Sequence, residues 1–171
     1  RSTINLNLGD SLEAMKLMED NAYDLAIVDP PYGIKETGTG RNCYDKRRPH
    51  LKSVRKEKHV KKDWDNAIPT NEYFCELFRV SKNQIIWGAN YFTEHVPSSM
   101  GWVFWDKKTE QQDFSDGELA YTSFERALKK FRVHKFHATR GGKDCIHPTQ
   151  KPIKLYEWLL TNYANEGDKI L

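Results

Sequence analysis

Short apolar runs along the chain alternate with segments of helical periodicity, which is typical of an α/β domain. The clearest run is LAIV at residues 25–28, and it predicts a strand over residues 24–29 that is buried on both faces. Residues 84–87 (QIIW) and 102–105 (WVFW) predict two further buried strands. Residues 119–123 and 131–136 predict a late pair of strands, which we expect to be antiparallel.

The first 29 residues are expected to form a β-α-β unit. Residues 4–8 alternate apolar and polar side chains, which predicts a short strand. Asp10 and Glu13 resemble a capping box, so a helix should begin after Asp10. Its apolar residues recur at helical spacing: Leu12, Met15 and Met18. Two strands joined by a helix predict a parallel sheet.

Two more helices are predicted further along. The first begins after Pro69-Thr70, and its apolar face consists of Tyr73, Phe74, Leu77 and Phe78. The second begins at Pro152, because proline suits a first helical turn, and Gly167 is expected to cap it. The apolar stripe of this second helix consists of Ile153, Tyr156, Leu159, Leu160 and Tyr163. Residues 169–171 are expected to begin another strand.

Length and composition indicate a single globular domain. With 171 residues, 38% apolar and 30% charged, it fits one globular domain with a sizeable core. Neither an apolar stretch of membrane-spanning length nor a signal-peptide pattern is present in the sequence, so we expect no membrane partner. The three cysteines are scattered, which predicts a reducing, cytoplasmic location. No metal is expected, because His137, Cys145 and His147 lack a fourth ligand and a regular spacing.

Positive charge is concentrated in one segment. Residues 41–62 contain ten Lys or Arg and two Asp or Glu, a local charge of +8, so with a net charge of +3 the remainder carries 3 − 8 = −5. A basic segment on a mildly acidic body indicates a polyanion as partner. A solvated loop without a partner is the alternative. The candidate phosphate contacts are Lys46, Arg47, Arg48, Lys52, Arg55, Lys56, Lys58, Lys61 and Lys62.

The motif DPPYG at residues 29–33 carries the candidate chemistry. Asp29 directly follows the buried strand, so its carboxylate should emerge where open α/β sheets bind ligands. Pro30 and Pro31 fix the turn, and Tyr32 presents a flat aromatic face beside the acid. An acceptor, rigid carbonyls and an aromatic plate together suit a planar ring that carries an exocyclic amine.

Two motifs in this order resemble the β-class DNA amino-methyltransferases. They are DPPY at residues 29–32 and HPTQKP at residues 147–152, supported by GDS at residues 9–11 and WGANYF at residues 87–92. The likeness runs from about residue 3 to the end. It implies a Rossmann-like sheet, mostly parallel with a late antiparallel strand and a circularly permuted motif order. It also implies methyl transfer from S-adenosylmethionine (SAM) to adenine N6 or cytosine N4.

The resemblance implies a role for each motif residue. The Asp29 carboxylate and the Pro30 carbonyl would accept the two N–H groups of the target amine, and Tyr32 would stack on a base flipped out of DNA. Asp10 and Ser11 would hold the adenosine part of SAM, although simple helix capping is an alternative for both. The remaining candidates for SAM binding are Asp29 itself and, at the methionine end, His147, Thr149 and Lys151. Asn90 could line the base pocket or form a turn.

The expected organisation is one catalytic domain over residues 1–171, which ends before the Gly-rich SAM loop of that family. The basic loop at residues 34–66 is expected to take part of the target-recognition role. In that family, aspartate at the first position of DPPY favours adenine, so the resemblance implies site-specific DNA adenine-N6 methylation, as in restriction-modification. A homodimer is expected by analogy with the family. Two alternatives stay open, an RNA adenine methyltransferase and a non-catalytic nucleic-acid-binding subunit.

Overall fold

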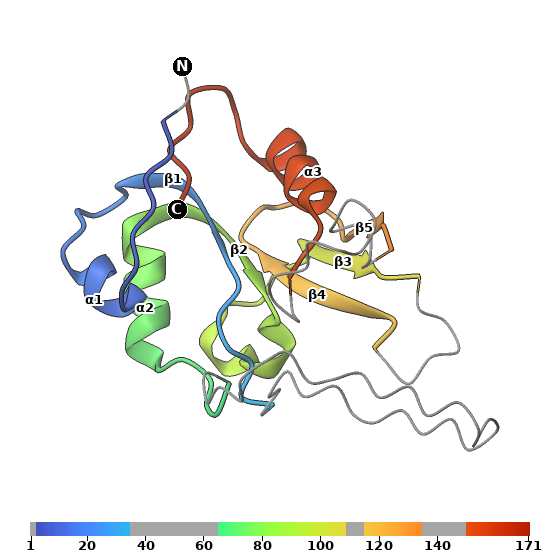
Figure 1. Cartoon of the computed structure of the whole chain (residues 1–171), viewed down its shortest axis with the longest axis horizontal. Helices are drawn as coiled ribbons and strands as arrows, with labels where there is room; N and C mark the ends of the chain where they lie inside the picture. Colours follow the sequence, from blue (N-terminus) through green and yellow to red (C-terminus); the bar gives the residue numbers. More distant parts are fainter. Residues whose placement is uncertain (1–2, 35–64, 109–114, 135–149) are drawn as a thin grey trace, which may run out of the picture.

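The computed structural model describes residues 3–34, 65–108, 115–134 and 150–171. Within these ranges five strands form one sheet in the order β1-β2-β4-β3-β5 (Figure 1). The strands are β1 (Tyr23–Val28), β2 (Ser81–Trp87), β3 (Trp102–Asp106), β4 (Gly117–Thr122) and β5 (Lys129–Arg132). The helices are α1 (Ser11–Lys16), α2 (Asn71–Val80) and α3 (Ile153–Tyr163), and the 3-10 turns are η1 (Ala89–Tyr91) and η2 (Thr93–His95).

The sheet is mixed. β1 runs parallel to β2 and β3 parallel to β5, whereas β4 lies between β2 and β3 and is antiparallel to both. The predicted α/β class and the late antiparallel strand are therefore confirmed. The expected pairing of residues 119–123 with residues 131–136 is wrong. Because β2 and β3 occupy both edges of β4, the last strand joins the free edge of β3 instead.

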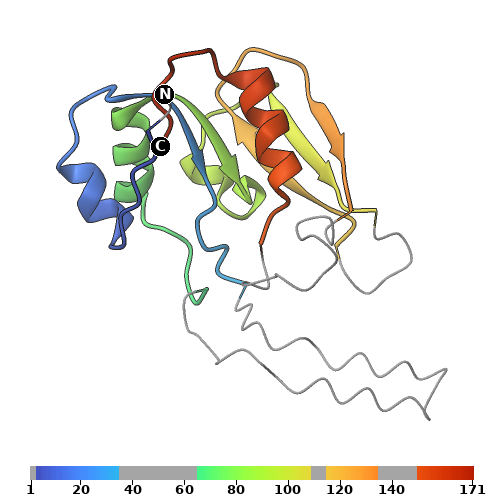
Figure 2. The ribbon, with the colours of Figure 1, turned by 45° about the horizontal axis from the view of Figure 1, so that its top comes forward.

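Helices cover the two faces of the sheet, as Figures 1 and 2 show. On one face α1 and α2 pack on β1, β2 and β4 through a buried cluster that includes Met15, Phe74 and Leu77. On the other face α3 packs on the sheet through Leu155 and Leu159. This three-layer order explains why β1 and β2 are apolar on both sides. Trp87 and Trp105 are buried in this core, and Trp102 is partly buried.

The starts of α1 and α2 follow the predicted caps. Asp10 Oδ1 accepts hydrogen bonds from the backbone N–H groups of Leu12 (2.8 Å) and Glu13 (3.2 Å). Thr70 caps α2 by accepting from the Tyr73 N–H. Such caps satisfy donors that have no partner inside the helix.

The predicted strand at residues 4–8 does not form. Ile4, Leu6 and Leu8 are largely exposed, and the segment has no strand assignment. The edge of β1 is occupied instead by the last residues of the chain, because Ile170 forms a parallel bridge with Leu25 and Ile27 N–H donates to Leu171 C=O. Alternating side chains alone do not make a strand where no sheet edge is available. Residues 169–171 were expected to begin a strand; they pair with β1, but only Ile170 is assigned, as an isolated bridge.

The buried side of α3 differs from the predicted stripe. Leu155, Leu159 and Tyr163 are buried, whereas Ile153 and Leu160 are exposed. Gly167 does not cap this helix, because α3 ends at Tyr163 and Gly167 adopts φ +92° in a later turn. None of the helices in the described ranges combines the length and the apolar character that crossing a bilayer requires.

Candidate active site

The turn after β1 brings Asp29 out at the C-terminal end of the strand, as the sequence predicts. Pro30 is buried, and the following turn is fixed by Asp65, a buried residue. Asp65 Oδ1 accepts hydrogen bonds from the backbone N–H groups of Tyr32 (2.7 Å) and Gly33 (2.9 Å). Gly33 adopts φ +70°, a conformation that glycine reaches without strain. The turn is therefore held rigidly beside the carboxylate.

Both the ring and the hydroxyl of Tyr32 are held by neighbouring residues. Its ring stacks on Tyr91, with ring centroids 5.1 Å apart and an interplanar angle of 15°. Its hydroxyl donates to Asp29 Oδ1 at 2.7 Å. Burial raises the pKa of the Tyr32 phenol well above its ordinary range, and the charges of Asp29 and Glu118 raise it further. The hydroxyl therefore keeps its proton and acts as a donor to Asp29.

Lys151 comes to the same place from the start of α3, and its side chain is only 3% exposed. Its ammonium lies 2.5 Å from Asp29 Oδ2, 3.2 Å from Glu118 Oε2 and 3.2 Å from the Tyr32 hydroxyl oxygen. It also lies over the Trp87 ring, 5.3 Å from its centroid. Three acceptors thus surround a group that has three N–H donors.

Glu118 and Lys107 complete the cluster. Glu118 Oε1 pairs with Lys107 Nζ at 2.5 Å, and its other oxygen faces Lys151. Burial acts to raise the pKa of the Glu118 carboxyl, but the two ammonium groups outweigh burial and the pKa is lowered. Two carboxylates and two ammonium groups balance to zero charge, which makes a largely buried cluster tolerable.

The structure therefore joins Asp29, Tyr32 and Lys151, which the sequence analysis selected from motifs more than a hundred residues apart. It does not join Asp10 and Ser11 to them, because no contact in the described part of the chain links either residue to the cluster, and Asp10 caps α1. Asn90 is exposed in η1. His147, Thr149 and the nine basic residues proposed as phosphate contacts lie outside the described residues.

Sequence reasoning missed three residues that shape the site: Glu118, Lys107 and Asp65. The signal for Glu118 was present, because a single acid opens an otherwise apolar strand. Asp65 carried no signal, since it acts from 33 residues away on the Tyr32 backbone. Lys107 follows β3 in a run of charged residues, so its sequence context did not distinguish it from ordinary surface lysines.

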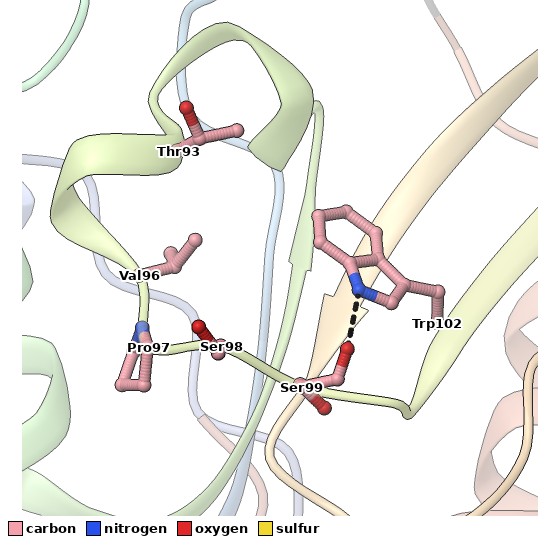
Figure 3. Close-up of a pocket in the computed structure, with 6 residues that line it drawn as sticks. All are labelled: Thr93, Val96, Pro97, Ser98, Ser99 and Trp102. Carbon is pink, nitrogen blue, oxygen red and sulfur yellow. Dashed lines mark hydrogen bonds between the residues drawn. The ribbon is translucent and has the colours of Figure 1, made fainter.

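A surface pocket of about 270 Å³ lies elsewhere and shares no residue with this cluster. Figure 3 shows Trp102 facing the segment of Thr93 and Val96, with its indole N–H donating to Ser99 C=O at 3.0 Å. The lining residues are Thr93, Val96, Pro97, Ser98, Ser99 and Trp102. These side chains carry no charge, so this pocket offers no charged group to a ligand.

Similarity to known proteins concerns the chain as a whole, not its individual site residues. No protein-family model matches the chain. The chain is 22% identical to the Type II methyltransferase M.HpaI of Haemophilus parainfluenzae over 203 aligned residues, which cover 95% of this chain and 60% of that protein. The chain thus spans about 60% of the length of this curated relative. This distant similarity is to a methyltransferase and does not identify the substrate.

Proposed function

We propose that this chain carries the methyl-transfer site of a SAM-dependent methyltransferase that acts on an exocyclic amine of a base in DNA, with adenine N6 as the first candidate. One observation carries the proposal: the Asp29 carboxylate is held at the end of β1 by the Tyr32 hydroxyl and the Lys151 ammonium. The distant similarity to a Type II methyltransferase supports the same class of reaction.

The Asp29 carboxylate suits a base amine. Such an amine is a weak nucleophile because its lone pair is delocalised into the ring. A carboxylate offers about four acceptor positions, and here Tyr32 and Lys151 each contact one oxygen. Because the Asp29 side chain is 32% exposed, its outward positions can accept an N–H of the amine. With the Pro30 carbonyl as second acceptor, this favours a pyramidal nitrogen whose lone pair faces the methyl donor.

The proton balance needs no strong base before attack. Asp29 receives the proton that the nitrogen loses once its new bond to carbon has formed, and the exposed side of the carboxylate passes it to water. Tyr32 does not compete for this role, because its raised pKa keeps its own proton in place. The positive charge of Lys151 keeps the cluster neutral before the transfer.

Bound SAM would supply an activated methyl group on a positively charged sulfur. The residues around Asp29 fit that charge, since a carboxylate and the stacked rings of Tyr32 and Tyr91 all attract a cation. Lys151 was expected to bind the methionine end of SAM. Its three N–H groups already face Asp29, Glu118 and Tyr32, so we assign it to holding Asp29 instead.

A base inside a duplex cannot reach the end of a buried strand, so the proposal requires base flipping. Tyr32 was expected to stack on the flipped base, but one of its faces is covered by Tyr91. Tyr91 is 46% exposed and is the more accessible aromatic surface. Stacking on one aromatic ring contributes roughly 1–3 kcal/mol per base. We propose DNA as partner because residues 34–66 are rich in Lys and Arg, although RNA would satisfy the same charge.

The test is methyl transfer from isotopically labelled SAM to duplex DNA, followed by nucleoside analysis. We expect N6-methyladenine, and an Asp29→Asn variant should lose about a thousandfold in rate. Asp24→Asn is a matched control, because Asp24 lies at the other end of β1, is 30% exposed and pairs with Lys82 at 2.6 Å. Asp24→Asn should keep full activity.

Other outcomes change the assignment. If the product is N4-methylcytosine, the substrate base is cytosine and not adenine. If structured RNA is methylated faster than duplex DNA, the substrate is RNA. Calorimetry that detects no SAM binding, together with nucleic-acid binding, would support a non-catalytic subunit. Turnover of the Asp29→Asn variant at the rate of Asp24→Asn would contradict the proposed role of the carboxylate.

A further inference from the structure

Glu118 lies at the active-site edge because β4 is reversed. β1 ends at this edge, and the last paired residue of β2 is Trp87, opposite Ala120. Residues before Ala120 therefore extend past the end of β2, and Glu118 pairs there with Trp105 of β3. A strand that ran the other way would begin at the far edge of the sheet. The reversal thus places a carboxylate beside Asp29 that has no counterpart in the DPPY motif.

The Lys151 ammonium is held by three acceptors, and Glu118 is the one that lies outside the DPPY motif. Lys151 Nζ lies 3.2 Å from Glu118 Oε2, and Lys107 ties the other Glu118 oxygen at 2.5 Å. Glu118 is itself mostly buried, with 23% of its side chain exposed. Lys107, which follows β3, therefore fixes one oxygen of Glu118, and the other oxygen binds the Lys151 ammonium.

Without Glu118 the buried ammonium would lose one of its two charged partners. A buried ammonium with an unused donor is costly, so Lys151 would turn further toward Asp29, its remaining carboxylate. It would then compete with the target amine for the outward acceptor positions of Asp29. With Glu118 present, the ammonium stays bound to Asp29 Oδ2 while the other oxygen is oriented by Tyr32.

We propose that Glu118 is a positioning residue of this site: it anchors the Lys151 ammonium so that Asp29 stays oriented with its outward acceptor positions open to the target amine. This inference rests on the proposed methyl-transfer function for its effect on rate. The arrangement of Lys151 itself is independent of that function. Both parts can be measured separately.

The principal variant is Glu118→Gln, which keeps the shape and removes the charge. We expect kcat to fall at least tenfold, while KM for SAM and for DNA changes less than threefold. Glu76→Gln is the matched control, because Glu76 also pairs with a cation, Arg79, and its side chain is 21% exposed. That variant should retain the kcat of the unsubstituted chain. Equal kcat for both variants would overturn the proposal.

The second measurement does not need activity. Nitrogen-15 NMR of lysine ammonium groups detects those held in slow exchange by burial and ion pairing, and the Lys151 signal is assigned by its absence in Lys151→Met. In Glu118→Gln we expect this signal to shift and its hydrogen exchange to rise at least fivefold, with no change in Glu76→Gln. An unchanged Lys151 signal would overturn the anchoring role, even if methyl transfer is absent from every variant.

A third variant covers the case in which Glu118→Gln does not fold, as judged by circular dichroism. Glu118→Asp keeps the charge but withdraws it by one methylene. It should show an intermediate rise in Lys151 exchange and an intermediate loss in kcat. Full retention of both properties would count against anchoring by Glu118. The unsubstituted chain could lack methyl transfer while Glu118→Gln still shifts the Lys151 signal. That result would reject the proposed function but keep the role of Glu118 in holding Lys151.

Discussion

The ring of Tyr32 lies against Gly88 so closely that a Cβ on Gly88 would stand 2.1 Å from Tyr32 Cε1. Gly88 follows β2 and adopts φ +69°, while Tyr32 follows β1. The two strands are parallel neighbours, so their ends meet at the same edge of the sheet. Glycine at this position leaves room for the tyrosine ring, whose hydroxyl donates to Asp29.

Gly88→Ala should therefore displace Tyr32 and break its hydrogen bond to Asp29. The positive φ alone costs about 1–2 kcal/mol for a residue with a Cβ, and the overlap with the ring adds roughly 1–3 kcal/mol. Gly167→Ala is the matched control, because Gly167 also has positive φ but a Cβ added to it would meet no atom within 4 Å. Chemical denaturation compares the two variants.

We expect Gly88→Ala to lose at least about 1 kcal/mol more stability than Gly167→Ala, because only at Gly88 does the added methyl group overlap a ring. It should also lose methyl transfer, whereas Gly167→Ala should not. Equal losses of stability would show that Tyr32 moves aside freely.

Alkaline pH should destabilise the fold through buried tyrosines. Burial raises the pKa of Tyr73 to about 12, with a smaller effect of the Asp29 charge, and burial first and then the charges of Asp29 and Glu118 raise the pKa of Tyr156 to about 12. In the unfolded chain both phenols ionise near pH 10. Their contribution is therefore present below pH 10 and is lost as the pH rises from 10 to 12.

The expected loss is roughly 2 kcal/mol for each of these tyrosines. Urea denaturation at pH 8, 10 and 11.5 measures it, and Tyr73→Phe should flatten the decline because phenylalanine does not titrate. A variant that declines as steeply as the unsubstituted chain would contradict burial of the Tyr73 phenol.

Arg79 of α2 fixes the end of α1. Its guanidinium donates to the Met15 and Met18 carbonyls, each at 2.8 Å, and pairs with Asp20 and Glu76. Arg79→Lys keeps the charge but cannot reproduce this fork, so amide hydrogen exchange in α1 should accelerate at least tenfold.

Lys16→Met is the control for Arg79, since Lys16 also links α1 to α2, but through an ion pair with Glu72 that water screens. Its effect on exchange in α1 should stay below threefold. If the two variants behave alike, the carbonyl contacts of Arg79 do not hold α1.

The sequence predicted those parts of the fold that depend on burial. Residues 25–28 and 84–87 form strands because apolar residues on both sides need helices on both faces. The sequence-based prediction was wrong where strand formation depends on which other segment is available for pairing. Residues 4–8 have the pattern of a strand, but the residues around Ile170 occupy the edge of β1. Strand pairing depends on which edges are free, and the pattern within one strand does not contain that information.

The same division applies to the site. Asp29 and Tyr32 were predictable because strand and turn chemistry place them locally. Lys151 was selected from a motif, yet its contact with Asp29 depends on how α3 packs on the sheet. Glu118 was not predictable, because its role follows from the reversal of β4. A charged group whose partners come from three elements has no signature within any one of them.

The basic segment at residues 41–62 yields a prediction from charge alone. If it contacts phosphates, Arg47→Gln, Arg48→Gln and Lys52→Gln together should lower the slope of log affinity for duplex DNA against log salt by up to about three, since each neutralised phosphate contributes about 0.9.

The control neutralises three exposed lysines of the described fold, Lys82, Lys129 and Lys154. Fluorescence anisotropy between 50 and 200 mM salt, a range over which phosphate contacts change affinity by orders of magnitude, measures both slopes. Equal slopes for the two triple variants would favour the alternative that the segment is only a solvated loop, because general loss of charge acts alike in both.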